Sequence, residues 1–194
     1  VPFILIDAVL LGSVVYFLTG LTLTGSGWHF FLYLFILFSQ GISGAALIRA
    51  IGFSSKTRNG AMAIAVLVLV LEIVFSGSVA TFDLLPDIYY INPVAWVIIS
   101  AMQNEFLSET YTASTANETL PATAPNINGK CALYCGGTIC PKPYPDMNCG
   151  EYFLKSRQFP TDQWYMWFGV GYAWFALFFF VCVGTIVLKF IKHD

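Results

Sequence analysis

The stretch that decides the fold reads IYYINPVAWVIISAMQNEF, residues 88–106. Its apolar part begins at Pro93 and ends at Met102. A helix that crosses a bilayer needs about 20 apolar residues, so this segment is too short to cross, yet it is too apolar for an exposed loop. Proline suits the first turn of a helix, and Asn92 is a good cap before it. We therefore predict a short re-entrant or interfacial helix over about residues 93–103.

The composition predicts an all-α membrane protein. Of the 194 residues, 57% are hydrophobic and 10% are charged, whereas soluble proteins average about 25% charged residues. Four apolar runs are each long enough to cross ~30 Å of hydrocarbon as a helix. We predict three transmembrane helices with short links within residues 1–80, an external region over 81–163, and a last transmembrane helix and tail over 164–194. The expected helices are about 1–23, 28–53, 60–80 and 164–188.

The basic residues predict the orientation. Cytoplasmic loops of membrane proteins carry an excess of Lys and Arg. We therefore expect the second short link and the C-terminus to be cytoplasmic and residues 81–163 to be extracellular, in a multi-pass protein of the plasma membrane. With a net charge of −2 and no basic surface, the chain is not expected to bind nucleic acid; its expected contacts are membrane lipids. The orientation prediction rests on the basic residues Arg49, Lys56, Arg58, Lys189 and Lys192.

No catalytic site is expected in this chain. The two histidines, His29 and His193, fall at opposite membrane edges, so they cannot join one nucleophilic triad. The glycines are scattered and form no phosphate-binding loop. The sequence opens on Val1-Pro2 without a signal-peptide pattern, so we expect a longer parent chain to carry any enzymatic motif.

Four cysteines fall within the predicted external region, where an oxidising compartment favours disulfides. An even count allows two disulfides with three possible pairings. A zinc site is the weaker alternative, because no Cys-x-x-Cys pair or supporting histidine is nearby. Asn117 begins a glycosylation sequon on the same side, which supports the outward assignment. The four cysteines are Cys131, Cys135, Cys140 and Cys149.

Two acidic residues interrupt the apolar runs, Asp7 in the first and Glu72 in the third. An acidic side chain at mid-bilayer costs about 2.5–3.5 kcal/mol on insertion scales, so it normally faces protein, water or a partner. Glu72 is the better functional candidate. It either lines a substrate path or pairs with a basic residue on a helix outside this chain, or it is a neutral carboxylic acid hydrogen-bonded to a neighbouring helix.

Three motifs follow one another along the chain. They are Val74-Phe75-Ser76-Gly77, then Asn92-Pro93 followed eleven residues later by Asn104-Glu105-Phe106-Leu107, and then Cys149-Gly150-Glu151-Tyr152-Phe153-Leu154 before a Trp-rich last run. In this order they resemble the C-terminal half of a transmembrane domain in the G subfamily of ATP-binding-cassette exporters. That subfamily includes the breast cancer resistance protein and the pleiotropic drug resistance transporters. The resemblance covers nearly the whole chain.

The resemblance implies the transmembrane part of an ATP-driven exporter of amphipathic, lipid-like or xenobiotic compounds. ATP and magnesium would be bound by nucleotide-binding domains of the parent protein, and a second transmembrane domain would complete the path. The third apolar run would form one wall of that path, and Ser78-Val79 stand where some members carry a paired-leucine plug. The implied path residues are Val70, Glu72, Ile73, Phe75, Ser78 and Val79.

Two other readings stay open at this point. A four-span scaffold of the tetraspanin type also has a cysteine-rich loop before its last helix, although the Cys-Cys-Gly signature of tetraspanins is absent here. An accessory subunit of a larger membrane complex is the other alternative.

Overall fold

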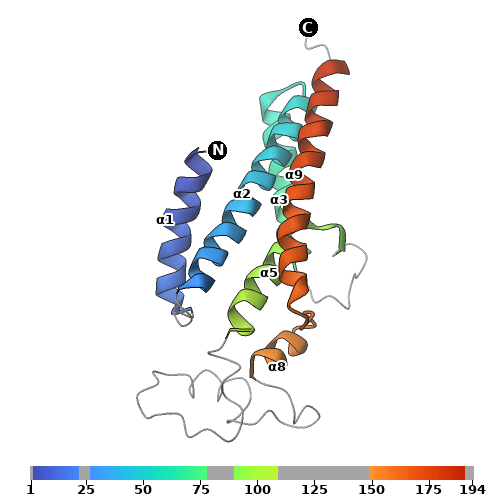
Figure 1. Cartoon of the computed structure of the whole chain (residues 1–194). Coiled ribbons are helices and arrows are strands. Elements are labelled where there is room, and N and C mark those ends of the chain that lie inside the picture. Colours follow the sequence, from blue (N-terminus) through green and yellow to red (C-terminus); the bar gives the residue numbers. More distant parts are fainter. Residues whose placement is uncertain (1, 22–26, 78–89, 109–148, 191–194) are drawn as a thin grey trace, which may run out of the picture.

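The computed structural model describes residues 2–21, 27–77, 90–108 and 149–190, and these residues fold into helices without a strand (Figure 1). The predicted all-α class is therefore confirmed for the described part of the chain. The helices are α1 (Pro2–Thr19), α2 (Trp28–Ser54), α3 (Arg58–Val74), α5 (Pro93–Phe106), α8 (Cys149–Ser156) and α9 (Trp164–Phe190).

Three of the described helices, α1, α2 and α9, are long and apolar enough to cross a membrane. The third apolar run forms a shorter helix than expected, because α3 has 17 residues and ends at Val74. At 1.5 Å per residue it is about 26 Å long, less than the ~30 Å of a hydrocarbon core. The Ser76 hydroxyl donates to the Ile73 carbonyl, and Gly77 has a left-handed φ of 84°, so the backbone turns there. Residues 78–89 lie outside the described part.

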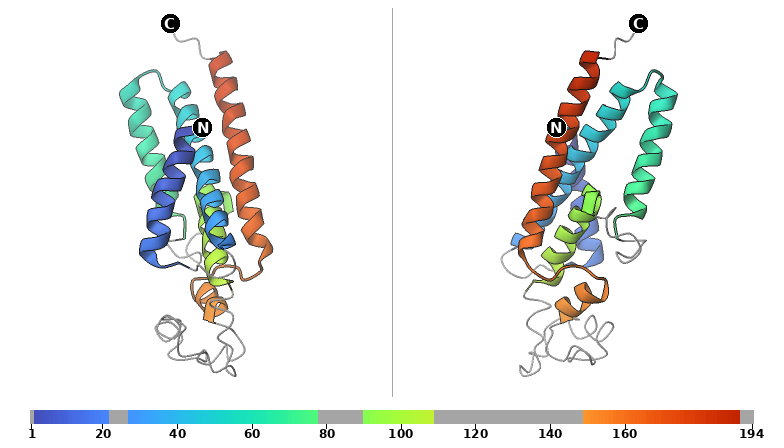
Figure 2. Two further views of the ribbon diagram at one scale, coloured as in Figure 1. Left: turned by 60° about the vertical axis from the view of Figure 1, so that its left-hand side comes forward. Right: turned by 90° about the vertical axis from the view of Figure 1, so that its right-hand side faces the viewer.

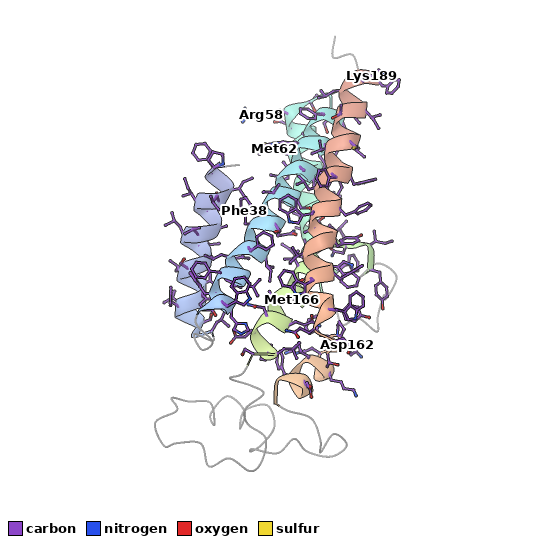
Figure 3. All side chains as sticks on the ribbon, viewed as in Figure 1. Phe38, Arg58, Met62, Asp162, Met166 and Lys189 are labelled. Carbon is purple, nitrogen blue, oxygen red and sulfur yellow. The ribbon has the colours of Figure 1, made fainter. Side chains whose placement is uncertain are left out.

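The four longer helices run up and down along one direction (Figures 1 and 2). α2 and α3 are joined by a tight link in which the Thr57 side chain caps α3 by accepting from the Gly60 amide at 3.3 Å. Arg58 and Lys189 lie at one end of the bundle and Asp162 lies at the other (Figure 3). The two basic regions that the sequence places on one side of the membrane therefore share one end of the fold.

Small residues bring the long helices close together. Ala8, Gly12 and Tyr16 form the buried stripe of α1. Gly184 of α9 lies against α2, where a Cβ on it would stand 3.7 Å from the Ala50 Cα. Lipid tails are as apolar as the side chains, so membrane helices associate through such close packing and through hydrogen bonds.

α5 packs antiparallel along the first half of α9. The Tyr172 hydroxyl donates to the Ile91 carbonyl at 3.0 Å, just before α5 begins. Further along, the Ser100 hydroxyl lies 2.8 Å from the Met166 carbonyl oxygen. The Gln103 amide then donates to the carbonyl of Pro160 at 2.7 Å, beyond the start of α9. The short helix predicted from the sequence is thus present, buried among longer helices.

The structure differs from the sequence prediction in two places, at the end of α5 and at α8. α5 continues to Phe106, beyond the predicted residue 103, because Asn104 and Glu105 are buried at 3% and 5% exposure rather than facing water. The helix α8 was not predicted. It forms because its apolar side covers the end of α5: Phe153 stacks on Phe106 with ring centroids 4.0 Å apart, and Leu154 is fully buried.

Gly169 offers a test of the α5–α9 contact. A Cβ at this position would collide with the Ser100 hydroxyl and with the Trp96 carbonyl oxygen, and a backbone atom cannot move aside cheaply. We expect Gly169→Ala to destabilise the full-length protein by about 1–3 kcal/mol, the usual cost of overpacking. The measurement is thermal unfolding of the purified protein in lipid nanodiscs.

Gly171 is the matched control for that experiment. It lies on the same helix, and nothing lies within 4 Å of its added Cβ. Gly171→Ala should leave the melting temperature unchanged or raise it slightly, because Ala favours a helix over Gly by up to ~1 kcal/mol. Equal melting temperatures for the two variants would contradict the close contact.

Candidate functional site

α3 separates the predicted path residues onto two opposite faces. Val70 and Ile73 are 51% and 55% exposed and lie on one face with Met62 and Val66, with spacings of three and four residues. No residue of α3 is buried. Figure 2 shows α3 at the edge of the bundle. This open apolar face, Met62, Val66, Val70 and Ile73, is therefore not covered by any described part of the chain.

Glu72 and Phe75 lie on the other face of α3, which turns toward the rest of the chain. Together with Val68 and Leu71 they line a cavity of about 350 Å³. Leu47 of α2 and Phe180 of α9 line its other sides, and Ile91, Asn92 and Pro93 at the start of α5 complete the lining of a cavity that is widely open at its mouth. Apart from Glu72 and Asn92, the lining side chains are apolar. The resemblance to known exporters did not distinguish these two faces, whereas the helical spacing of the residues does.

Asn92 joins α3 to the start of α5. Its side-chain amide donates to the Glu72 carbonyl oxygen at 2.7 Å, and its Oδ1 accepts from the Val94 backbone amide at 2.9 Å. The first bond satisfies a carbonyl near the end of α3, and the second caps α5 as predicted. The indole of Trp96 donates to the Tyr90 carbonyl at 2.9 Å, which fixes the turn before the cap.

The Glu72 carboxylate receives no hydrogen bond or ion pair from the described residues; the bond from Asn92 goes to its backbone oxygen. The side chain is half-buried in the bundle. The two readings of Glu72, a path residue and an acid hydrogen-bonded to a neighbouring helix, therefore both stay predictions. An acidic group in apolar surroundings needs a compensating partner, water or loss of its charge.

A second polar cluster lies near the opposite end of α5. Asn104 makes two contacts with His29 at the start of α2: its amide donates to the His29 carbonyl at 2.9 Å, and its Oδ1 lies 3.1 Å from the His29 Nδ1. Gln103 also donates to the Asp162 carbonyl at 3.2 Å, while its own buried Oε1 has no partner in the described structure. The sequence indicated Asn104 only as part of the Asn104-Glu105-Phe106-Leu107 motif, and Gln103 only as the end of the predicted short helix. Their spacing with Ser100, at three and four residues, is the signal for one buried polar face.

The other predicted site residues lie largely outside the described part of the chain. These are Ser78, Val79, the sequon residue Asn117, and Cys131, Cys135 and Cys140. Cys149 begins α8, but its side chain is not described. The disulfide and zinc readings therefore both stay predictions. Among the residues that are described, no three His, Cys, Asp or Glu side chains gather as metal ligands.

The two bonds of Asn92 can be separated by mutation. Asn92→Ala removes both, whereas Asn92→Ser keeps a capping oxygen and is too short to reach the Glu72 carbonyl. We expect Asn92→Ser to cost ~1 kcal/mol of unfolding free energy for the lost bond. Asn92→Ala should cost ~2 kcal/mol, because the cap is lost as well. Thermal unfolding in nanodiscs measures both, with the exposed Asn59→Ala as control. A melting temperature of Asn92→Ala equal to that of the unmodified protein would contradict this arrangement.

Comparison with known proteins shows the family of the chain. The family model described as "ABC-2 type transporter" matches residues 1–106, which include α1, α2, α3 and α5. The chain is 28% identical to the ABC multidrug transporter H of Aspergillus fumigatus over 190 residues, 94% of this chain and 13% of that protein.

Two further relatives cover nearly the whole chain. The pleiotropic ABC efflux transporter of multiple drugs of Saccharomyces cerevisiae is 29% identical over 187 residues, 93% of this chain and 12% of that protein. The ABC transporter G family member 2 of Dictyostelium discoideum is 25% identical over 198 residues, 100% of this chain and 14% of that protein. The chain thus spans only 12–14% of the length of these curated relatives.

These matches confirm the resemblance drawn from the three motifs. The family match alone covers residues 1–106 of 194, which is more than half of the chain. The more distant likeness to the G-subfamily and pleiotropic drug resistance transporters extends over most of the remainder. The chain belongs to the ABC-2 type transporter family, as part of a multi-pass membrane domain.

Proposed function

We propose that this chain is the transmembrane part of an ATP-driven exporter of amphipathic, lipid-like or xenobiotic compounds. The observation that carries the proposal is the open apolar face of α3, Met62, Val66, Val70 and Ile73, which no described residue covers. An amphipathic compound needs an apolar surface to leave the bilayer without exposing its own apolar area to water. The names of the relatives, two of them multidrug transporters or efflux proteins, agree with this reading.

The proposal gives the chain four membrane crossings. α3 would be the third of them, with its helix or the residues after Val74 completing the crossing. The end that holds Arg58 and Lys189 would face the cytoplasm, since short cytoplasmic segments are rich in Lys and Arg. α5 would then enter the membrane from the outside, and residues 81–163 would be extracellular, with the glycosylated Asn117 and two disulfides among the four cysteines.

The proposed partner of the open face is a second transmembrane domain, from another copy or from another part of the same protein. Two such faces placed opposite each other would enclose an apolar path between them. Nucleotide-binding domains that hold ATP and magnesium would move the two faces apart and together. Membrane lipids would cover the remaining exposed apolar side chains of α1 and α9.

Bulk added to the open face should obstruct transport. Val70→Trp is expected to lower the efflux of a fluorescent xenobiotic by about fivefold or more at unchanged surface expression, which is a loss of ~1 kcal/mol. The matched control is Val14→Trp on α1, because Val14 is 56% exposed, close to the 51% of Val70, and lines neither the cavity beside Glu72 nor the one between α1, α2 and α9. The measurements are efflux from cells and substrate-stimulated ATP hydrolysis by the full-length protein.

Val14→Trp should stay within about twofold of the unmodified protein, a change of less than ~0.5 kcal/mol. If Val70→Trp exports at the normal rate, the open face is not a wall of the path. Equal losses in both variants would likewise oppose the proposal, because they would show a general response to bulk on a lipid-facing surface.

A further inference from the structure

The cavity beside Glu72 is distinct from the open face of α3. The two lie on opposite sides of the helix: Val70 and Ile73 point away from the chain, while Glu72 and Phe75 point toward α2, α5 and α9. The cavity holds about 350 Å³, within the size range of pockets that take small organic molecules. It thus offers a binding volume with a chemistry that the open face lacks.

The charge of Glu72 is not balanced within the described structure. The basic side chains Arg58 and Lys189 lie at one end of the bundle (Figure 3). Arg58 is separated from Glu72 by fourteen residues of α3, which is about 21 Å along the axis. Arg49 of α2 lines a separate cavity between α1, α2 and α9. A cation that arrives from elsewhere would therefore stabilise the charged form of Glu72 in these half-buried, apolar surroundings.

The rest of the lining suits the body of an organic cation rather than a metal ion. The aromatic side chains of Phe75 and Phe180 line the cavity on two sides. Aromatic faces attract ammonium groups electrostatically, by up to ~2 kcal/mol when the site is desolvated. Val68, Leu71 and Leu47 provide apolar contact but no oxygen ligands. A small metal ion would need several oxygen or nitrogen ligands, which these side chains do not supply.

We propose that the Glu72 cavity binds lipophilic organic cations, with the carboxylate facing the positive centre and the two phenylalanines beside the apolar body. This inference deepens the proposed function, on which it rests, by giving the exported compounds a charge class. Neutral and anionic compounds would use the open face without this carboxylate. The bond from Asn92 goes to the Glu72 backbone and fixes that part of α3 beside the cavity, so it does not occupy the carboxylate oxygens.

The test compares two ions of nearly equal shape and opposite charge, tetraphenylphosphonium and tetraphenylborate. Binding of each is measured on the full-length protein in nanodiscs. Glu72→Gln, which removes the charge and keeps the shape, should weaken tetraphenylphosphonium binding by about tenfold, or ~1.4 kcal/mol. Tetraphenylborate binding should not weaken. Glu72→Asp, which keeps the charge, should retain most of the cation affinity and shows that the site is folded.

Asp7→Asn is the matched control, because Asp7 is the other acidic residue within an apolar run and is exposed on α1, away from the cavity lining. It should leave binding of both ions unchanged. The inference is overturned if Glu72→Gln binds tetraphenylphosphonium as tightly as the unmodified protein, or if both ions lose affinity equally. That failure would leave the proposed function standing, whereas a lack of ATP-driven efflux by the unmodified full-length protein would overturn the proposed function whatever Glu72→Gln does.

Discussion

A helix that starts in a buried position needs hydrogen-bond partners for its first amides and for the turn before it. α5 meets this constraint with side chains from its own chain. Asn92 caps the helix and reaches α3, and the Trp96 indole and the Tyr172 hydroxyl satisfy the two carbonyls just before it. Because these bonds come from α3, α5 and α9, the three helices cannot shift independently. The place of α5 therefore decides how the remaining helices pack.

The position of α5 also determines what each face of α3 can do. Its first turn lies on the side of α3 that carries Glu72 and Phe75, so that side becomes an open cavity bordered by neighbouring helices. The opposite side, with Val70 and Ile73, meets no described residue. One short helix thus divides α3 into an inner surface with a carboxylate and an outer apolar surface. The two proposed roles of α3, an apolar wall and a cation site, rest on this division.

Much of the fold could be predicted because apolar runs and caps are local signals. The spans of α1, α2 and α9 follow from length and composition, and Asn92-Pro93 marks the start of α5. The features that could not be predicted from the sequence depend on contacts between residues distant in the chain. The apolar side of α8 packs against the end of α5, and Asn104 is buried against His29. Both contacts join residues that are far apart in the sequence. Helical spacing predicts that Val70 and Glu72 lie on opposite faces of α3. It does not predict which of the two faces is covered, because that depends on where α5 packs.

The central claim is that α5 is a fixed, buried helix rather than a segment resting loosely on the membrane surface. Hydrogen exchange of the α5 backbone amides, measured on the full-length protein in nanodiscs, tests it most directly. The account predicts that amides from Ile98 to Phe106 exchange as slowly as those in the middle of α9, since both are protected by the same packing. Exchange of these amides as fast as at the frayed end of a helix would contradict it.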